Sequence, residues 1–77
     1  MPVIADCNSA PIGMSKNADF NGNNVANRPP NMYGGYILTI KQLGWGMQLA
    51  LPRDEIHFCL YMRHIIKGSW TNWFTIS

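Results

Sequence analysis

The chain contains little charge. Only 13% of its 77 residues are Asp, Glu, Lys or Arg, which is about half the share that is usual in a soluble domain. The net charge of +2 comes from six dispersed basic residues, a pattern that argues against nucleic-acid binding. So small and charge-poor a chain is expected to bury part of its surface against other subunits.

Cysteine is also scarce, with Cys7 and Cys59 far apart in the sequence. Two cysteines do not make a disulfide framework. We therefore expect free, mostly buried thiols, with a single disulfide as the alternative.

Long apolar runs are missing as well. No stretch reaches the roughly 18 apolar residues of a membrane span, so no membrane insertion is expected. The first seven residues have neither a basic start nor an apolar run, so no secretory signal is expected either.

Carboxylates are too few and too badly spaced to suggest catalysis. Glu55 follows Asp54 directly, so in a strand the two side chains point to opposite faces. His57 and Cys59 lack a third group to orient a thiol–imidazole pair, and Gly34-Gly35 lacks the flanking strand and helix of a phosphate-binding loop. We predict that the protein is not an enzyme.

What the chain does contain is apolar and aromatic. Hydrophobic residues make up 47%, with three each of Trp, Tyr and Phe, so a folded core is expected. At this length we predict one small domain, residues 1–77, that buries only about 60% of its unfolded surface.

The domain divides into two parts of different texture. Residues 1–33 hold seven of the eight asparagines and four of the five prolines, so we predict an ordered, loop-rich segment with one or two short strands. Residues 34–77 alternate apolar and polar side chains, which predicts an antiparallel β-meander. The fold class is therefore all-β, with four predicted strands at residues 36–43, 47–51, 55–67 and 70–76.

Within this meander, reversals are predicted at Gly44-Trp45-Gly46, at residues 52–54 and at Gly68-Ser69. In the third strand five of the six even positions from 56 to 66 are apolar, which favours a strand over the competing helix. Its other face carries Tyr61 and Arg63. In the last strand we place Trp70 and Trp73 on opposite sides.

The order of these landmarks resembles the C-terminal domains of bacteriophage tail fibres, including the knob-like repeats of R-type pyocin fibres. That resemblance covers roughly residues 5–76, with Met14 in place of an expected aromatic residue. It is carried by an Asp-x-Asn element, an Asn- and Pro-containing loop, a Gly-led strand, strands with Gln and Arg, and a Gly-x-Trp-x-x-Trp ending: Asp6, Asn8, Gly13, residues 27–30, Gly35, Gln48, Arg63, Gly68, Trp70 and Trp73.

The resemblance implies a homotrimer at the tail of a virion, made in the cytoplasm of the bacterial host. It also implies attachment to a surface receptor of the bacterium, which we expect to be a glycan.

Three residues are predicted to contact this receptor: Trp45, Tyr61 and Arg63. Arg and Tyr give directional hydrogen bonds to hydroxyl- and phosphate-rich polysaccharides, although a solvated face or a subunit contact is the alternative. Trp45, between two glycines, is either exposed or folded back onto the sheet. For Trp70, Trp73 and Phe74 we favour packing in the core or at a subunit interface over a sugar-stacking platform.

A weak metal hypothesis concerns His57 and Cys59, which share one face of the third strand. On a three-fold axis three such pairs would suit Zn or Fe. A surface histidine beside a half-buried cysteine is favoured, so no cofactor is predicted.

Two other functions remain open. The domain could be a structural trimerisation or capping piece of a fibre without receptor contact. It could also be a small phage-encoded inhibitor of a host protein.

Overall fold

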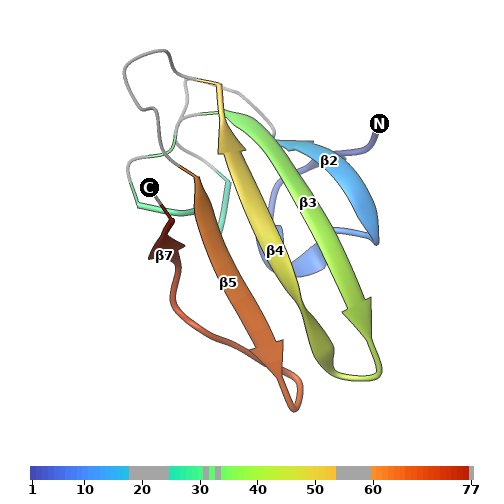
Figure 1. Cartoon of the computed structure of the whole chain (residues 1–77). Coiled ribbons are helices and arrows are strands. Elements are labelled where there is room, and N and C mark those ends of the chain that lie inside the picture. The colour runs from blue at the N-terminus through green and yellow to red at the C-terminus, as the bar shows by residue number, and fades with distance from the viewer. Residues whose placement is uncertain (18–24, 31, 33, 54–59, 77) are drawn as a thin grey trace.

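A computed structural model describes residues 1–17, 25–30, 32, 34–53 and 60–76 (Figure 1). These residues form one curled, mixed sheet of seven strands and contain a single 3₁₀ turn but no α-helix, which confirms the predicted all-β class. The elements in chain order are β1 (Val3–Ile4), η1 (Cys7–Ser9), β2 (Gly13–Asn17), β3 (Gly35–Gln42), β4 (Trp45–Pro52), β5 (Tyr61–Ile66), β6 (Ser69–Trp70) and β7 (Phe74–Thr75).

The strand order is β1-β2-β3-β4-β5-β6, and β7 also pairs with β5. β1 runs parallel to β2, and every other pair is antiparallel. The sheet is therefore larger than the predicted four-stranded meander, because the loop-rich N-terminal part adds β1 and β2 to it. Residues 54–59, which include most of the first half of the predicted third strand, lie outside the described residues.

Two tight turns connect β3 to β4 and β5 to β6. Leu43 and Gly44 have φ of 48° and 83°, and Lys67 and Gly68 have φ of 52° and 84°. Positive φ at both central positions is the geometry of the type I′ turn, whose twist matches that of the flanking strands. The first reversal therefore occurs at Leu43–Gly44 rather than at Gly44-Trp45-Gly46, and Trp45 becomes the first residue of β4.

The predicted last strand, residues 70–76, is broken in the middle. Its two pieces, β6 and β7, pair with opposite ends of β5. Between them the Thr71 backbone N–H donates to the carbonyl of His64 over 2.8 Å, and the Thr71 hydroxyl accepts the backbone N–H of His64 over 3.0 Å. Because the chain leaves the strand geometry here, Trp70 and Trp73 do not alternate and both lie against Arg63.

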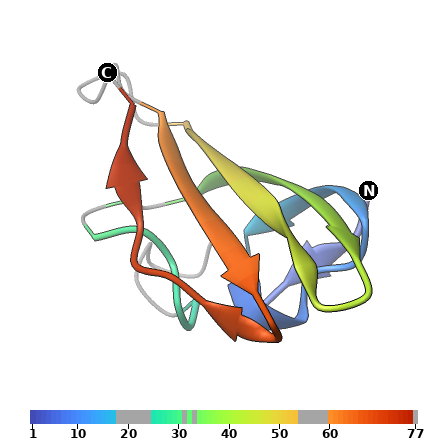
Figure 2. The ribbon, with the colours of Figure 1, turned by 60° about the horizontal axis from the view of Figure 1, so that its bottom comes forward.

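The N-terminal segment and the segment around residues 25–32 lie on one side of the sheet (Figure 2). We call this covered side the inner face and the opposite side the outer face. The apolar core on the inner side is small, and it consists of Ile4, Cys7, Ala10, Val25, Met32, Ile37, Ala50 and Tyr61, with Trp73 packed against it. Five polar or charged side chains are buried with them: Ser15, Asn17, Thr39, Gln48 and Arg63.

The described part of the chain contains no helix that is long and apolar enough to cross a membrane.

Candidate functional site

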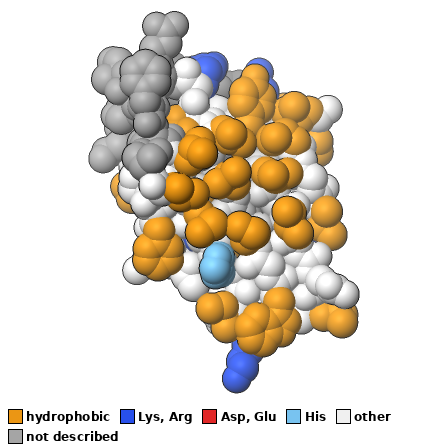
Figure 3. All heavy atoms as spheres, viewed as in Figure 1, with side chains coloured by type: hydrophobic (Ala, Val, Ile, Leu, Met, Phe, Trp, Pro, Cys, Tyr) orange, Lys and Arg blue, Asp and Glu red, His pale blue; other side chains and the backbone are white. Residues whose placement is uncertain are grey.

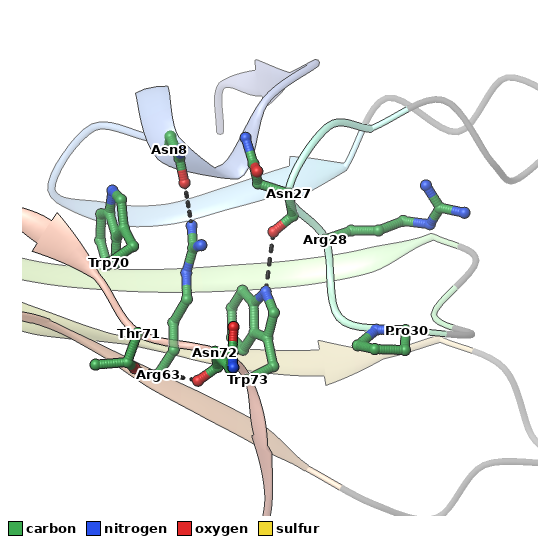
Figure 4. Close-up of a pocket in the computed structure, with 9 residues that line it drawn as sticks. All are labelled: Asn8, Asn27, Arg28, Pro30, Arg63, Trp70, Thr71, Asn72 and Trp73. Carbon is green, nitrogen blue, oxygen red and sulfur yellow. Dashed lines mark hydrogen bonds between the residues drawn. The ribbon is translucent and has the colours of Figure 1, made fainter.

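Arg63 occupies the centre of a polar network on the inner face. Its side chain is only 4% exposed. Its Nε donates to Oε1 of Gln48 over 2.8 Å. Its Nη2 donates to Oδ1 of Asn8 over 2.7 Å, the bond that Figure 4 shows. Because Gln48 and Arg63 are opposite each other in the register of β4 and β5, the strand pairing itself brings the two side chains together.

Gln48 extends this network to the N-terminal segment. Its Nε2 donates to the carbonyl of Cys7 over 2.7 Å and to Oγ1 of Thr39 over 3.1 Å. A buried amide must find partners, since an unpaired buried donor costs about 1–3 kcal/mol. Gln48 therefore connects three strands and η1 through hydrogen bonds that only this arrangement provides.

Two tryptophans hold the guanidinium of Arg63 between them. Its central carbon lies 4.2 Å from the ring centroid of Trp70 and 4.7 Å from that of Trp73. A desolvated cation–π contact of this kind contributes on the order of 2 kcal/mol. The indole N–H of Trp73 also donates to the carbonyl of Asn27 over 2.9 Å, which ties the C-terminal segment to the loop around residue 27 (Figure 4).

Asp6 completes the network from the N-terminal side. One carboxylate oxygen accepts the backbone N–H of Asn8 and the side-chain N–H of Asn27, each over 2.9 Å. The bond from Asn27, and to a smaller extent the bond from Asn8, lower the pKa of Asp6 from its ordinary value. The positive charge of Arg63 lowers it further. Asp6 thereby holds Asn8, which accepts a bond from Arg63, and Asn27, which accepts one from Trp73.

Burial affects the two ionisable groups at the centre. It lowers the pKa of Arg63 from its ordinary value, while the nearby Cys7 and Asp6 act in the opposite direction. It raises the pKa of the Cys7 thiol to about 11, although Arg63 opposes this. Cys7 is a free, fully buried thiol, as predicted for it, and its neutral form is not a nucleophile at neutral pH. Cys59 lies outside the described residues.

A pocket of about 440 Å³ opens beside this network. Side-chain amides, parts of two indole rings and a guanidinium form its walls (Figure 4). They come from three distant parts of the chain: Asn8; Asn27, Arg28 and Pro30; and Arg63 with residues 70–73. The wall around residue 28 is fixed because Arg28 donates to the carbonyls of Met32 and Val25 over 3.0 and 3.2 Å.

The predicted receptor-contact residues are not gathered at one place. Arg63 lines the pocket, but it is buried, and Tyr61 is only 9% exposed and belongs to the core. The expectation that both are exposed is therefore wrong, because the N-terminal segment covers the face that carries them. Trp45 is 52% exposed and lies at a second, shallower hollow of about 400 Å³ near the turn after β3.

The three residues that were expected to pack in the core or at an interface differ in their exposure to solvent. Trp70 and Trp73 are half-buried around Arg63 and line the pocket, whereas Phe74 is 59% exposed. His57 and Cys59, the weak metal hypothesis, lie outside the described residues. Among the residues that are described, no cluster of three or more His, Cys, Asp or Glu side chains is suited to hold a metal ion.

The sequence did not predict that its scattered polar landmarks meet in space. Asn8 and Asn27 were not considered as site residues, although both contact the network and line the pocket. One feature of the strand pairing points to this network. Thr39, Gln48 and Arg63 lie opposite one another and form one row on the inner face of β3, β4 and β5. Polar residues in one row of an otherwise apolar sheet suggest mutual hydrogen bonding.

Comparisons of the chain with models of protein families, with curated proteins and with solved structures find no match.

Proposed function

We propose that the protein is a binding module at the tip of a phage-type tail fibre, where it attaches the particle to a glycan on the bacterial surface. The observation that carries this proposal is the pocket in which two indoles and several side-chain amides converge beside Arg63. The resemblance to tail-fibre domains supports it, because seven of the nine residues that line the pocket belong to that resemblance: Asn8, Asn27, Arg28, Pro30, Arg63, Trp70 and Trp73.

The chemistry of the pocket suits a sugar. Pyranose rings present apolar C–H faces that pack on aromatic rings, and their hydroxyls form hydrogen bonds with amides. Asn72 is exposed at the rim, where its side chain is available to a ligand. Arg63 contributes a fixed positive charge near the floor, while its bonds to Gln48 and Asn8 keep it in place.

One shallow site of this size gives a modest affinity, so we propose that the module acts as a homotrimer. Three identical sites that engage one glycan-coated surface together can exceed the single-site affinity by about 10² to 10⁴.

A second function, a capping or trimerisation domain without receptor contact, is favoured by a different observation. Most polar groups around the pocket already bond to one another: Arg63 to Gln48 and Asn8, and Trp73 to Asn27. A network of this kind is sufficient to stabilise the fold, and it requires no ligand.

Adsorption of the labelled protein to host cells, and to their purified surface polysaccharide, tests the proposal. Asn72→Ala removes an amide at the rim, and Asn72→Trp fills the pocket; both change an exposed side chain, so the fold should survive. Gln42→Ala is the matched control, because Gln42 is an exposed amide outside this pocket.

The proposal predicts that both Asn72 variants lose binding at least tenfold at unchanged melting temperature, while Gln42→Ala binds normally. A capping domain predicts that adsorption of the complete fibre is the same with all three variants. That second result would replace receptor binding with the structural function.

A further inference from the structure

The outer face of the sheet is apolar across its whole width. Five apolar side chains lie directly opposite one another on five neighbouring strands and form a continuous row. The row consists of Met14, Leu38, Leu49, Met62 and Phe74. Figure 3 views this face, on which hydrophobic side chains gather over β3, β4 and β5. Adjacent rows add Ile40 and Met47, and Tyr36 and Leu51.

This outer face differs from the one expected for an isolated antiparallel sheet. Such a sheet packs its apolar face on the core and leaves its polar face in water. Here the inner face buries a row of polar side chains beside its apolar core, whereas the outer face is apolar and partly exposed, with Ile40 at 55%. The described segments that leave the sheet lie on its inner face (Figure 2), so they do not cover the outer one. Within the described residues, the apolar side chains of the outer face therefore remain partly open to solvent.

The exposed apolar area is a substantial part of what a subunit interface needs. At about 200 Å² for a large side chain, the exposed fractions of Met14, Tyr36, Ile40 and Phe74 (39, 39, 55 and 59%) correspond to about 400 Å². The half-buried side chains between them, Leu38, Met47, Leu49, Leu51 and Met62, enlarge this area further. A patch of about 300–600 Å² is the largest that a typical monomer exposes, and such a patch is often functional. The four most exposed side chains alone supply about half of the roughly 800 Å² that one partner buries in a standard interface.

The low charge of the outer face indicates what kind of partner would bind it. Among the described residues of these rows, two side chains can carry a positive charge: His64 in the centre, and Lys16 at the edge, opposite Tyr36. A strongly charged partner would find almost nothing to pair with. An identical apolar face matches well, because packed sheets lie about 10 Å apart with interdigitating apolar side chains and most soluble oligomers are assembled from copies of one chain.

We propose that the outer face is the interface between copies of this chain. Copies that associate through it convert the outer rows into a shared hydrophobic core and leave the pocket beside Arg63 on the opposite side, open to solvent. This inference does not rest on the proposed function, because it concerns the other face of the sheet. Of the three residues for which the sequence predicted packing in the core or at an interface, Phe74 lies in the outer rows, whereas Trp70 and Trp73 lie against Arg63 on the inner face.

Light scattering after size exclusion, from micromolar to several hundred micromolar protein, tests the interface. The wild-type protein should associate, so its mass in solution should be at least twice the 8.7 kDa of one chain. Ile40→Glu places a carboxylate in the apolar rows and should weaken association at least tenfold. Leu43→Glu makes the same kind of change at the tip of the turn, where Leu43 is 91% exposed, and should leave the mass unchanged. A wild-type chain that is 8.7 kDa throughout would overturn the proposal.

A second measurement guards against a variant that fails to fold. The photoreactive residue p-benzoylphenylalanine in place of Phe74 should cross-link one copy to another on irradiation, at an outer-row residue of the partner. The same probe in place of Leu43 should give at least tenfold less product. Equal masses for wild type and Ile40→Glu, together with no cross-link from position 74, would also overturn the proposal.

Discussion

Gln48 and Arg63 lie opposite each other on β4 and β5, and the 2.8 Å hydrogen bond between them is buried. Through Gln48 the guanidinium is linked to the carbonyl of Cys7, and through its own Nη2 it is linked to Asn8. The N-terminal segment thus attaches to the sheet by polar bonds to its inner face. A domain with so few buried apolar side chains depends on such bonds for its stability.

Arg63→Met should therefore destabilise the fold. It keeps an apolar stem but leaves Gln48 Oε1 and Asn8 Oδ1 without their donor and removes two cation–π contacts. We expect a loss of about 2–4 kcal/mol in the free energy of unfolding, measured by urea titration. Lys67→Met, at an exposed turn, is the control and should change stability by less than about 0.5 kcal/mol. A loss that small for Arg63→Met would contradict the account.

The coupling between Gln48 and Arg63 is a separate prediction. Gln48→Leu combined with Arg63→Met should cost less than the two single losses added together, because each single variant already breaks the bond they share. A coupling energy of at least about 1 kcal/mol is expected from the double-mutant cycle. Strict additivity would show that the two residues stabilise the fold independently.

Trp73→Phe isolates one bond of the network. The smaller ring can still lie against Arg63, but the indole N–H that donates to the carbonyl of Asn27 is lost. We expect a loss of about 1 kcal/mol in the free energy of unfolding. Trp45→Phe makes the same replacement at an exposed position and should have no measurable effect; equal losses for both variants would argue against a role for the Asn27 bond.

Stability should depend on acid through Asp6. The pKa of this carboxyl is lowered below its ordinary value of 3.8 in the folded chain, so the folded state binds its proton less readily than the unfolded state does. Its contribution is therefore fully present above pH 3.8 and is lost as the pH falls through the folded value. The variant Asp6→Asn should flatten this part of the curve of melting temperature against pH. An unchanged curve would show that the other carboxyls cause the acid loss.

The Cys7 thiol should be unreactive while the protein is folded. Burial hides it, and a pKa of about 11 keeps it protonated near neutral pH. Alkylation by iodoacetamide at pH 8, followed by peptide mapping that separates Cys7 from Cys59, should label Cys7 at least tenfold more slowly than in urea-unfolded protein. Equal rates would mean that the N-terminal segment does not cover this site.

Alternation along the chain was sufficient to predict which side chains share a face. Tyr36, Leu38 and Ile40 lie together, and so do Tyr61 and Arg63. It was not sufficient to predict which face the chain covers, because that depends on whether a buried arginine can be satisfied. The partners of Arg63 come from positions 8, 48, 70 and 73, and no local pattern connects these positions.

The break between β6 and β7 was beyond local reasoning for a similar reason. Residues 70–76 have a strand-like composition, but Thr71 bonds to His64 and Trp73 reaches Asn27. These tertiary contacts outweigh the strand propensity of the segment. The pocket depends on that break, since it brings both indoles to the same guanidinium.

The central claim is that the pocket beside Arg63 binds a surface glycan, and the three tryptophans permit a direct test. Their indole N–H signals in a two-dimensional NMR spectrum can be followed while oligosaccharide from the host surface is added. The account predicts that the signals of Trp70 and Trp73 shift in a saturable manner, whereas that of Trp45, which lies outside the pocket, stays in place. Signals of Trp70 and Trp73 that remain unchanged at saturating oligosaccharide would contradict the claim.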